Sequence, residues 1–150
     1  MQTRLFLLML ITIITGSLLP MQAGINAKLG KLSGGAVIAA FISFLVGTVA
    51  LAMYILLTRK HSIHWSGLQT APVWLFAGGL IGAFYVAAIT FIVPTLGGAL
   101  TFGLIIAGQL LAAITIDHFG WLGMTVKEIS VGRITGAILL IVGVILIRKY

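Results

Sequence analysis

The chain has 150 residues, of which 61% are hydrophobic and only 7% are charged, and its mean hydropathy is +1.24. A soluble domain needs far more polar surface than this composition supplies, so the sequence predicts an integral membrane protein. The net charge of +7 comes from Lys and Arg residues that stand singly or in pairs between apolar runs. In such places basic residues set topology, and no basic run indicates a nucleic-acid partner.

Five apolar segments are long enough to cross a bilayer, since a spanning helix takes about 20 residues. They predict an all-α fold, an integral membrane bundle of five transmembrane helices that forms one domain over residues 1–150. The connections are expected to include a turn over residues 30–35 and a tight hairpin that begins at Pro94. The five helices are expected at residues 5–27, 36–58, 73–93, 99–116 and 131–147.

The first helix carries a polar stripe that runs into the segment PMQAGINAKLG. Thr12, Thr15, Gln22 and Asn26 share one helical face, and polar side chains at membrane depth are costly unless they find partners or water. Pro20 removes a backbone donor and is expected to kink the helix. A kinked helix with a polar stripe favours a transport pathway. The alternative is that these side chains hold helices together.

The later helices carry few polar side chains, and those few are candidates for contact with a substrate. Ser43 lies in the second helix, Tyr85 in the third and Gln109 near the middle of the fourth. A glutamine at that depth needs an internal partner or a wet cavity. We expect a substrate site between the first, second and fourth helices of two copies. Its candidate residues are Gln22, Asn26, Ser43, Tyr85 and Gln109.

The end of the fourth helix holds one of the two acids of the chain, Asp117, next to His118. The simpler interpretation is a charge at the membrane interface that pairs with Arg133. The alternative is a proton-coupling site, because histidine changes its charge near physiological pH. The residues favour the first interpretation and leave the second open.

The fifth helix presents a face of glycines. Gly132 and Gly136 form a GxxxG pattern, and Gly143 lies seven residues beyond Gly136. This spacing places a smooth groove down one side of the helix, where another helix can approach closely. We expect this face to be a dimer interface.

Five spans place the two termini on opposite sides of the membrane, with five basic residues on one side and four on the other. The positive-inside rule depends on that difference. Because the difference is a single residue, copies could insert in both orientations. Two such copies would form an antiparallel homodimer with a site at their shared midplane. The alternative is one fixed orientation with a different, oppositely inserted partner. One side carries Arg4, Arg59, Lys60, Lys127 and Arg133, and the other Lys28, Lys31, Arg148 and Lys149.

Five blocks of sequence, taken in order, resemble a known family. They are PMQAGINAKLG, AAFISFLVGT, GGLIGAFYV, TFGLIIAGQLLAAITIDHFGWLG and RITGAILLIVGV, and they cover essentially the whole chain. The chain resembles the YdcZ-type proteins, half-size members of the drug/metabolite transporter superfamily. The resemblance implies a multi-pass protein of the bacterial inner membrane with five helices, dual topology or paired genes, and a role in export.

The hairpin at Pro94 and the spacing from Gly136 to Gly143 also resemble the small multidrug resistance branch, in which the glycine helix is a dimerisation face. That branch places a glutamate within the first helix to bind cations and protons. The first helix here carries no acid. This departure speaks against cation exchange of that type, and a neutral or zwitterionic metabolite suits the site at least as well as a cation.

The sequence and the resemblance together predict a transporter subunit that exports a small metabolite or drug-like compound by alternating access. It would work as an antiparallel homodimer surrounded by membrane lipid. We expect no enzyme activity, no cofactor, no metal site and no nucleic-acid partner. The alternative function is a non-transporting scaffold, or a partner subunit of a heteromeric complex.

Overall fold

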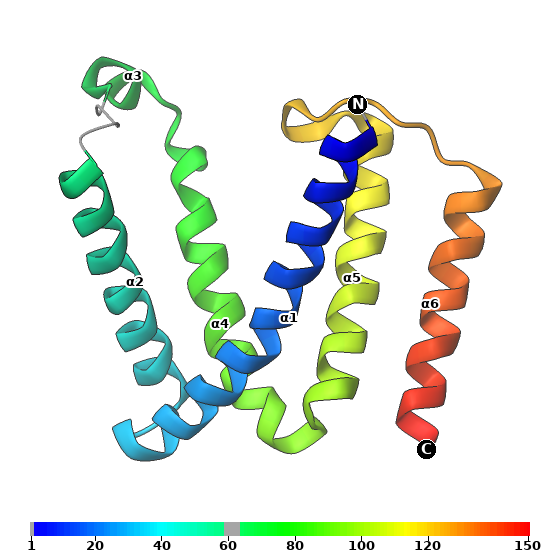
Figure 1. The fold of residues 1–150 in the computed structure, drawn as a ribbon, viewed down its shortest axis with the longest axis horizontal. Helices are drawn as coiled ribbons and strands as arrows, with labels where there is room; N and C mark the ends of the chain where they lie inside the picture. Colours follow the sequence, from blue (N-terminus) through cyan, green and yellow to red (C-terminus); the bar gives the residue numbers. More distant parts are fainter. Residues whose placement is uncertain (1, 59–63) are drawn as a thin grey trace. The chain divides into compact units, whose positions relative to one another are not determined.

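The structure, a computed structural model, describes residues 2–58 and 64–150, and every regular element in these ranges is helical (Figure 1). The predicted all-α fold is confirmed, and so are five helices long and apolar enough to cross a membrane. The basic pair at residues 59–60 lies outside the described ranges. The elements, with η for a 3-10 helix, are α1 (Gln2–Ser33), α2 (Ala36–Thr58), α3 (Trp65–Thr70), η1 (Val73–Phe76), α4 (Ala77–Leu96), α5 (Gly98–Phe119), η2 (Trp121–Gly123) and α6 (Val131–Lys149).

α1 continues past the predicted end of the first helix and stops only at Ser33. The expected turn over residues 30–35 was therefore wrong for residues 30–33, which are helical. The chain turns where Gly34 and Gly35 adopt φ angles of +97° and +136°, which other residues rarely adopt. The Gly35 N–H donates to the Gly30 carbonyl at 2.8 Å, a hydrogen bond that closes many helix C-termini.

α4 also runs further than predicted, through Pro94 to Leu96. A proline in the last turn removes only the N–H that would bond the Thr90 carbonyl, so the helix continues for two more residues. It ends at Gly97, whose φ is +78°, and α5 begins at the next residue. The hairpin expected to begin at Pro94 is therefore a break of one residue.

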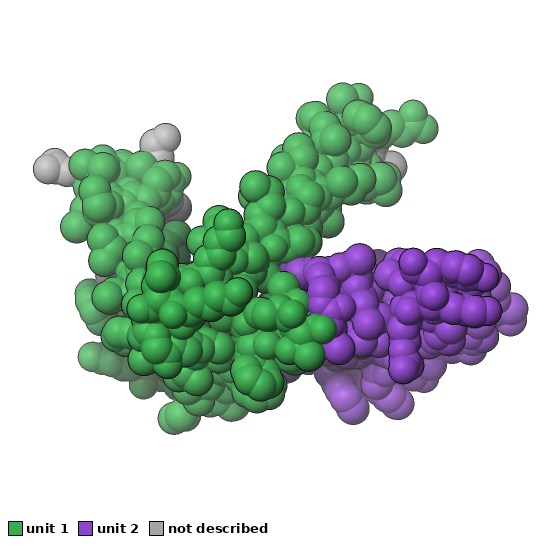
Figure 2. All heavy atoms as spheres, turned by 90° about the horizontal axis from the view of Figure 1, so that it is seen from below, with its two compact units in different colours: residues 1–95 green, residues 96–150 purple. Residues whose placement is uncertain are grey.

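The chain divides into two compact units, residues 1–95 and residues 96–150, which Figure 2 draws in different colours. The single domain expected over residues 1–150 stays a prediction. Few side chains are buried: in the most apolar window of each span, the buried share is 0–11%. Most of the apolar surface of the five spans is therefore not covered within either unit.

In the first unit, α1 packs against α2 through small side chains. Ala23, Asn26 and Gly30 of α1 are buried, as are Ala39 and Ala40 of α2. Steps of three and four residues place the α1 set on one helical face. Small residues allow the two backbones to approach closely, which is how helices associate in membranes.

In the second unit, α5 and α6 approach each other at Gly103. An ideal Cβ on Gly103 would lie 3.1 Å from Cγ2 of Val144, so a side chain there would require Val144 to shift by a few tenths of an ångström. Thr101 and Ala137 are buried in the same unit. The Thr101 hydroxyl donates to the Gly97 carbonyl at 2.7 Å, so this polar group is satisfied inside its own helix.

The segment between α5 and α6 folds back over the end of α5. Gly120 ends α5 in the left-handed conformation with φ +63°. The Lys127 N–H donates to the Asp117 carbonyl at 2.9 Å, which ties the returning chain to the helix end. An ideal Cβ on Gly120 would lie 2.7 Å from Cγ2 of Val126. Both the backbone angle and the available space therefore require glycine at this position.

The substitution Gly120→Ala is expected to lower thermal stability more than Gly123→Ala. Both glycines have positive φ, +63° and +76°, but a Cβ on Gly123 meets nothing within 4 Å. The change at Gly123 therefore carries only backbone strain, about 1–2 kcal/mol, whereas the change at Gly120 adds the clash with Val126. Thermal unfolding in detergent measures the difference, and Val126→Ala added to Gly120→Ala should remove it. Equal losses for the two single variants would contradict the contact.

Candidate functional site

The hydroxyls of the predicted polar stripe bond to their own helix. Thr12 Oγ1 donates to the Leu8 carbonyl at 2.8 Å, and Thr15 Oγ1 donates to the Ile11 carbonyl at 2.9 Å. Both threonines are exposed, yet their donors need neither water nor a neighbouring helix. The need for polar partners therefore falls on the two amide side chains of the stripe.

The two amides of α1 lie in different surroundings. Asn26 is only 3% exposed, because it belongs to the face of α1 that packs against α2. Gln22, one turn earlier, is exposed. Asn26 is thus held in place by the helix contact, while Gln22 can meet a substrate, water or a further helix.

α1 is one continuous helix with Pro20 inside it. Figure 1 shows its axis changing direction between the dark-blue N-terminal half and the lighter-blue C-terminal part. Pro20 has no N–H to donate to the Gly16 carbonyl, and such a gap is a common cause of helix bends. The assignment of this bend to Pro20 stays a prediction.

The other three candidate contacts are spread over three helices. Ser43 of α2 and Tyr85 of α4 are half-buried in the first unit, and Gln109 is exposed on α5 in the second. Four of the five candidates therefore belong to residues 1–95 and one to residues 96–150. Their joint role in a substrate site stays a prediction.

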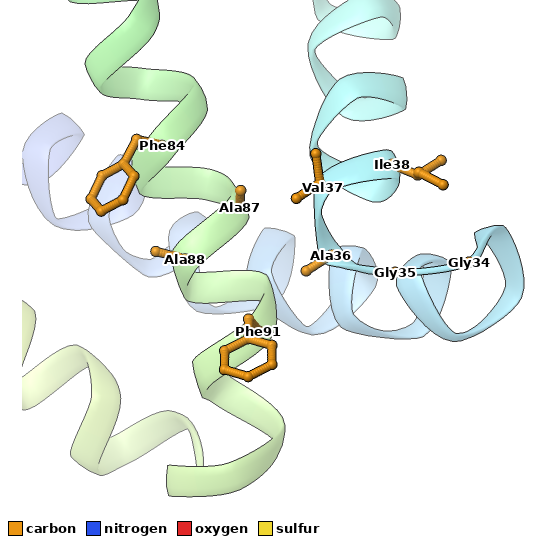
Figure 3. A pocket seen from close by; sticks show the side chains of 9 residues that line it. All are labelled: Gly34, Gly35, Ala36, Val37, Ile38, Phe84, Ala87, Ala88 and Phe91. Atoms are coloured by element: carbon orange, nitrogen blue, oxygen red, sulfur yellow. The ribbon is translucent and has the colours of Figure 1, made fainter.

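A pocket of about 470 Å³ lies in the first unit, between the start of α2 and α4 (Figure 3). Residues 34–38 line one side, and Phe84, Ala87, Ala88 and Phe91 line the other. The volume is in the range of small-molecule sites, and the walls are almost wholly apolar. None of the five polar candidates is among the described residues that line it.

The α4 wall of this pocket was not predicted from the sequence, although the residues carry a signal for it. Phe84 and Phe91 are seven residues apart, and Ala87 and Ala88 stand between them. Because these steps fall on one helical face, two aromatic rings flank a gap left by two small side chains. The pattern by itself does not indicate a pocket, because a pocket with apolar walls has no polar side chains to mark it.

The loop after α5 is tied together by an ion pair. The Arg133 Nη2 and Asp117 Oδ2 atoms lie 2.9 Å apart, and both side chains are half-buried. Arg133 Nη1 also donates to the Lys127 carbonyl at 3.0 Å, and His118 Nδ1 accepts from the Ile129 N–H at 3.4 Å. The pairing of Asp117 with Arg133 that the sequence favoured is present. A proton-coupling role for Asp117 and His118 stays a prediction.

The glycine face of α6 is open. An ideal Cβ on Gly132, Gly136 or Gly143 would meet nothing within 4 Å. α6 contacts α5 through a different face, on which Ala137 and Val144 are buried. The two faces are turned by roughly 100° from each other around the helix. A dimer interface on the glycines stays a prediction.

Almost the whole chain matches one protein family. Residues 7–146 match the family described as "Putative inner membrane exporter, YdcZ". The chain belongs to the YdcZ family. The inner membrane protein YdcZ of Escherichia coli (strain K12) is 27% identical to it over 131 residues, which are 87% of each chain. No solved structure gives a significant match.

Membership of the YdcZ family confirms the resemblance of the five sequence blocks and the expected place in the inner membrane. The YdcZ family is a family of transporters and not of enzymes. Its description names export without a substrate. The substrate class therefore has to be inferred from the residues of this chain.

Proposed function

We propose that this chain exports a small neutral or zwitterionic metabolite or drug-like compound by alternating access, as an antiparallel homodimer. One observation carries the proposal: Gln22 and Gln109 are exposed within membrane spans. An amide that faces lipid leaves its donors and acceptors without partners, which membrane proteins avoid. A water-filled cavity or another helix would therefore have to cover these two positions, and a transport pathway shared by two copies supplies both.

The charges of the spans support a neutral or zwitterionic substrate. The sequence has no Asp or Glu before Asp117, and Asp117 pairs with Arg133 at the end of α5. A bare cation in the spans would find no free counter-ion there. Amides and hydroxyls instead exchange hydrogen bonds with neutral polar groups. The apolar pocket beside α4 offers room for the apolar part of such a compound.

We assign substrate contact to polar residues of several helices. Rocking of one copy against the other around this fixed site would expose it to each side of the membrane in turn. The bend at Pro20 would let the two halves of α1 take different directions during that motion. The contact residues are Gln22, Asn26, Ser43, Tyr85 and Gln109.

We assign the dimer contact to the glycine face of α6. Gly132, Gly136 and Gly143 leave open space, so a helix of a second copy can approach closely. The near balance of basic residues, five against four, allows copies to insert in both orientations. Antiparallel pairing would then bring the polar groups of two copies to a shared midplane.

Asp117 and His118 are the candidates for coupling transport to protons. Uptake of a proton by Asp117 would weaken its ion pair with Arg133. Protonation of His118 at Nδ1 would release the Ile129 N–H that this atom accepts. Either event would loosen the connection between α5 and α6, which is how a proton would act on the helices.

Topology provides the test, because the sequence has no cysteine to interfere with thiol labelling. With Tyr150→Cys, which leaves the balance of five basic residues against four unchanged, a membrane-impermeant reagent is expected to label roughly half of the copies from outside intact cells, because so small a charge bias favours neither orientation. The remainder should react only after permeabilisation. Thr3→Cys is the matched control and should give the complementary fraction, since five spans separate the two positions. Labelling of all copies from one side would exclude dual topology and favour a separate partner chain.

A non-transporting scaffold or partner subunit is the second candidate. The observation that favours it is that the Thr12 and Thr15 hydroxyls donate to carbonyls of their own helix. Two of the four polar residues of the stripe therefore have hydrogen-bond partners without a transport pathway. In a scaffold, Gln22 and Gln109 would bond to a partner helix and water would be excluded. Water access to these two positions therefore distinguishes the two functions.

A further inference from the structure

A groove lies in the second unit, where α5 begins and α6 ends. It has a volume of about 260 Å³ and is lined by Leu96, Leu100, Leu104, Val144, Ile145 and Arg148. Sites for drug-sized ligands occupy roughly 300–1,000 Å³, so the groove suits part of a molecule rather than a whole one. Its walls are aliphatic, with a single guanidinium group among them.

The spacing of the lining residues explains the shape of the groove. Leu100 and Leu104 are one turn apart on one side of α5, and Leu96 is the last residue of α4, just before the break at Gly97. Val144, which packs against Gly103, lines the groove one turn before Arg148. Arg148 follows one turn later in the last turn of α6, where the helix reaches the membrane surface. The groove is therefore apolar inside and cationic at its mouth.

Arg148 forms no ion pair among the residues that the structure describes. The two acids of the chain are Glu128 and Asp117, and Asp117 pairs with Arg133. Both acids belong to the other end of the α5–α6 hairpin, and Arg133 is about 22 Å from Arg148 along α6 at 1.5 Å per residue. A basic residue in the last turn of a helix suits the helix dipole, but that reason does not account for its place in an apolar groove.

We propose that this groove binds an anionic glycerophospholipid, with one acyl chain along the leucine wall and the phosphate on Arg148. A guanidinium group matches the geometry of a phosphate with two parallel hydrogen bonds. The aliphatic part of the arginine lies along apolar surface while its charged end reaches the headgroups. A zwitterionic lipid offers the same chain, but its own cation competes for the phosphate. The net charge of the headgroup therefore decides which lipid is held.

Two substitutions of adjacent residues test the proposal. Arg148→Gln removes the cation that lines the groove, and Lys149→Gln removes the same charge from the same turn outside the groove. Native mass spectrometry of the purified chain, titrated with phosphatidylglycerol or phosphatidylcholine, measures the lipid retained. Arg148→Gln is expected to weaken phosphatidylglycerol binding about tenfold or more, as loss of a charge-assisted hydrogen bond does. Lys149→Gln should leave the preference for phosphatidylglycerol intact.

A third variant tests the apolar wall. Leu104→Trp fills the groove and is expected to lower the retention of both lipids together. Equal effects of Arg148→Gln and Lys149→Gln would mean general surface attraction and overturn the site. A change in dimer fraction without a change in lipid retention would mean that a second copy covers the groove, which also overturns it. If Arg148→Gln unfolds, Arg148→Lys keeps the charge and should still lose part of the preference for phosphatidylglycerol.

Discussion

The double substitution Gly103→Cys with Val144→Cys is expected to form a disulfide almost completely when membranes are treated with a mild oxidant. An ideal Cβ on Gly103 lies 3.7 Å from the Cβ of Val144. Disulfides join Cβ atoms about 3.5–4.5 Å apart, so the two positions fit without movement of the backbone. A protease site inserted after Ile129 provides the measurement. The fragments should stay together on a non-reducing gel and separate after reduction.

The matched control is Gly108→Cys with Val144→Cys. Gly108 is on the same helix, but an ideal Cβ there meets nothing within 4 Å. Fragments of this variant should separate without reduction. A cross-linked dimer formed by the Gly103 pair, in place of the internal bond, would mean that α6 packs against α5 of another copy. Separation of the fragments of both variants would contradict the α5–α6 contact itself.

The substitution Gln109→Cys is expected to react with a water-soluble, charged thiol reagent, and this is the largest effect that the transport proposal predicts. Gln109 is exposed near the middle of the α5 span. A thiol reacts as the thiolate, which forms only where water reaches it, so a thiol that faces lipid stays unreactive. Mass shift of the purified chain after labelling in membranes measures the modified fraction.

Leu111→Cys is the control, because Leu111 is 49% exposed on the same helix and lies almost opposite Gln109 around its axis. It should stay unlabelled. Gln22→Cys on α1 should behave like Gln109→Cys if both amides line one cavity. Absence of labelling at positions 22 and 109 would contradict the pathway and support the scaffold. Labelling at position 111 as well would show that α5 does not face lipid there.

The five spans could be predicted from the sequence because hydropathy is a local property that needs no knowledge of packing. The helix ends were less predictable. The glycines and lysines of residues 30–35 indicated a turn, but only Gly34 and Gly35 adopt positive φ, and α1 continues to Ser33. Pro94 indicated a helix end that comes at Gly97, since a proline in the last turn costs only one hydrogen bond.

In the candidate site, too, some contacts were predictable from the sequence and others were not. The pairing of Asp117 with Arg133 was predictable, because few charges exist near that end of α5 and opposite charges at an interface find each other. The α4 wall of the pocket, including Phe84 and Phe91, was not found. Apolar residues in a membrane protein are the rule, so only their arrangement in space separates a pocket wall from a lipid-facing surface.

The sequence by itself determined the class of the protein. The five apolar spans, the polar residues within them and the YdcZ family blocks can all be recognised from the order of the residues alone. Only the tertiary structure decided which face of each helix is in contact. It buries Asn26 while Gln22 stays exposed, and it packs Val144 rather than the glycine face of α6 against Gly103. The physical reason is that in lipid all faces of a helix are similarly apolar, so hydropathy does not distinguish the face that contacts another helix. Close packing of small side chains, which depends on three-dimensional fit, then selects the contact.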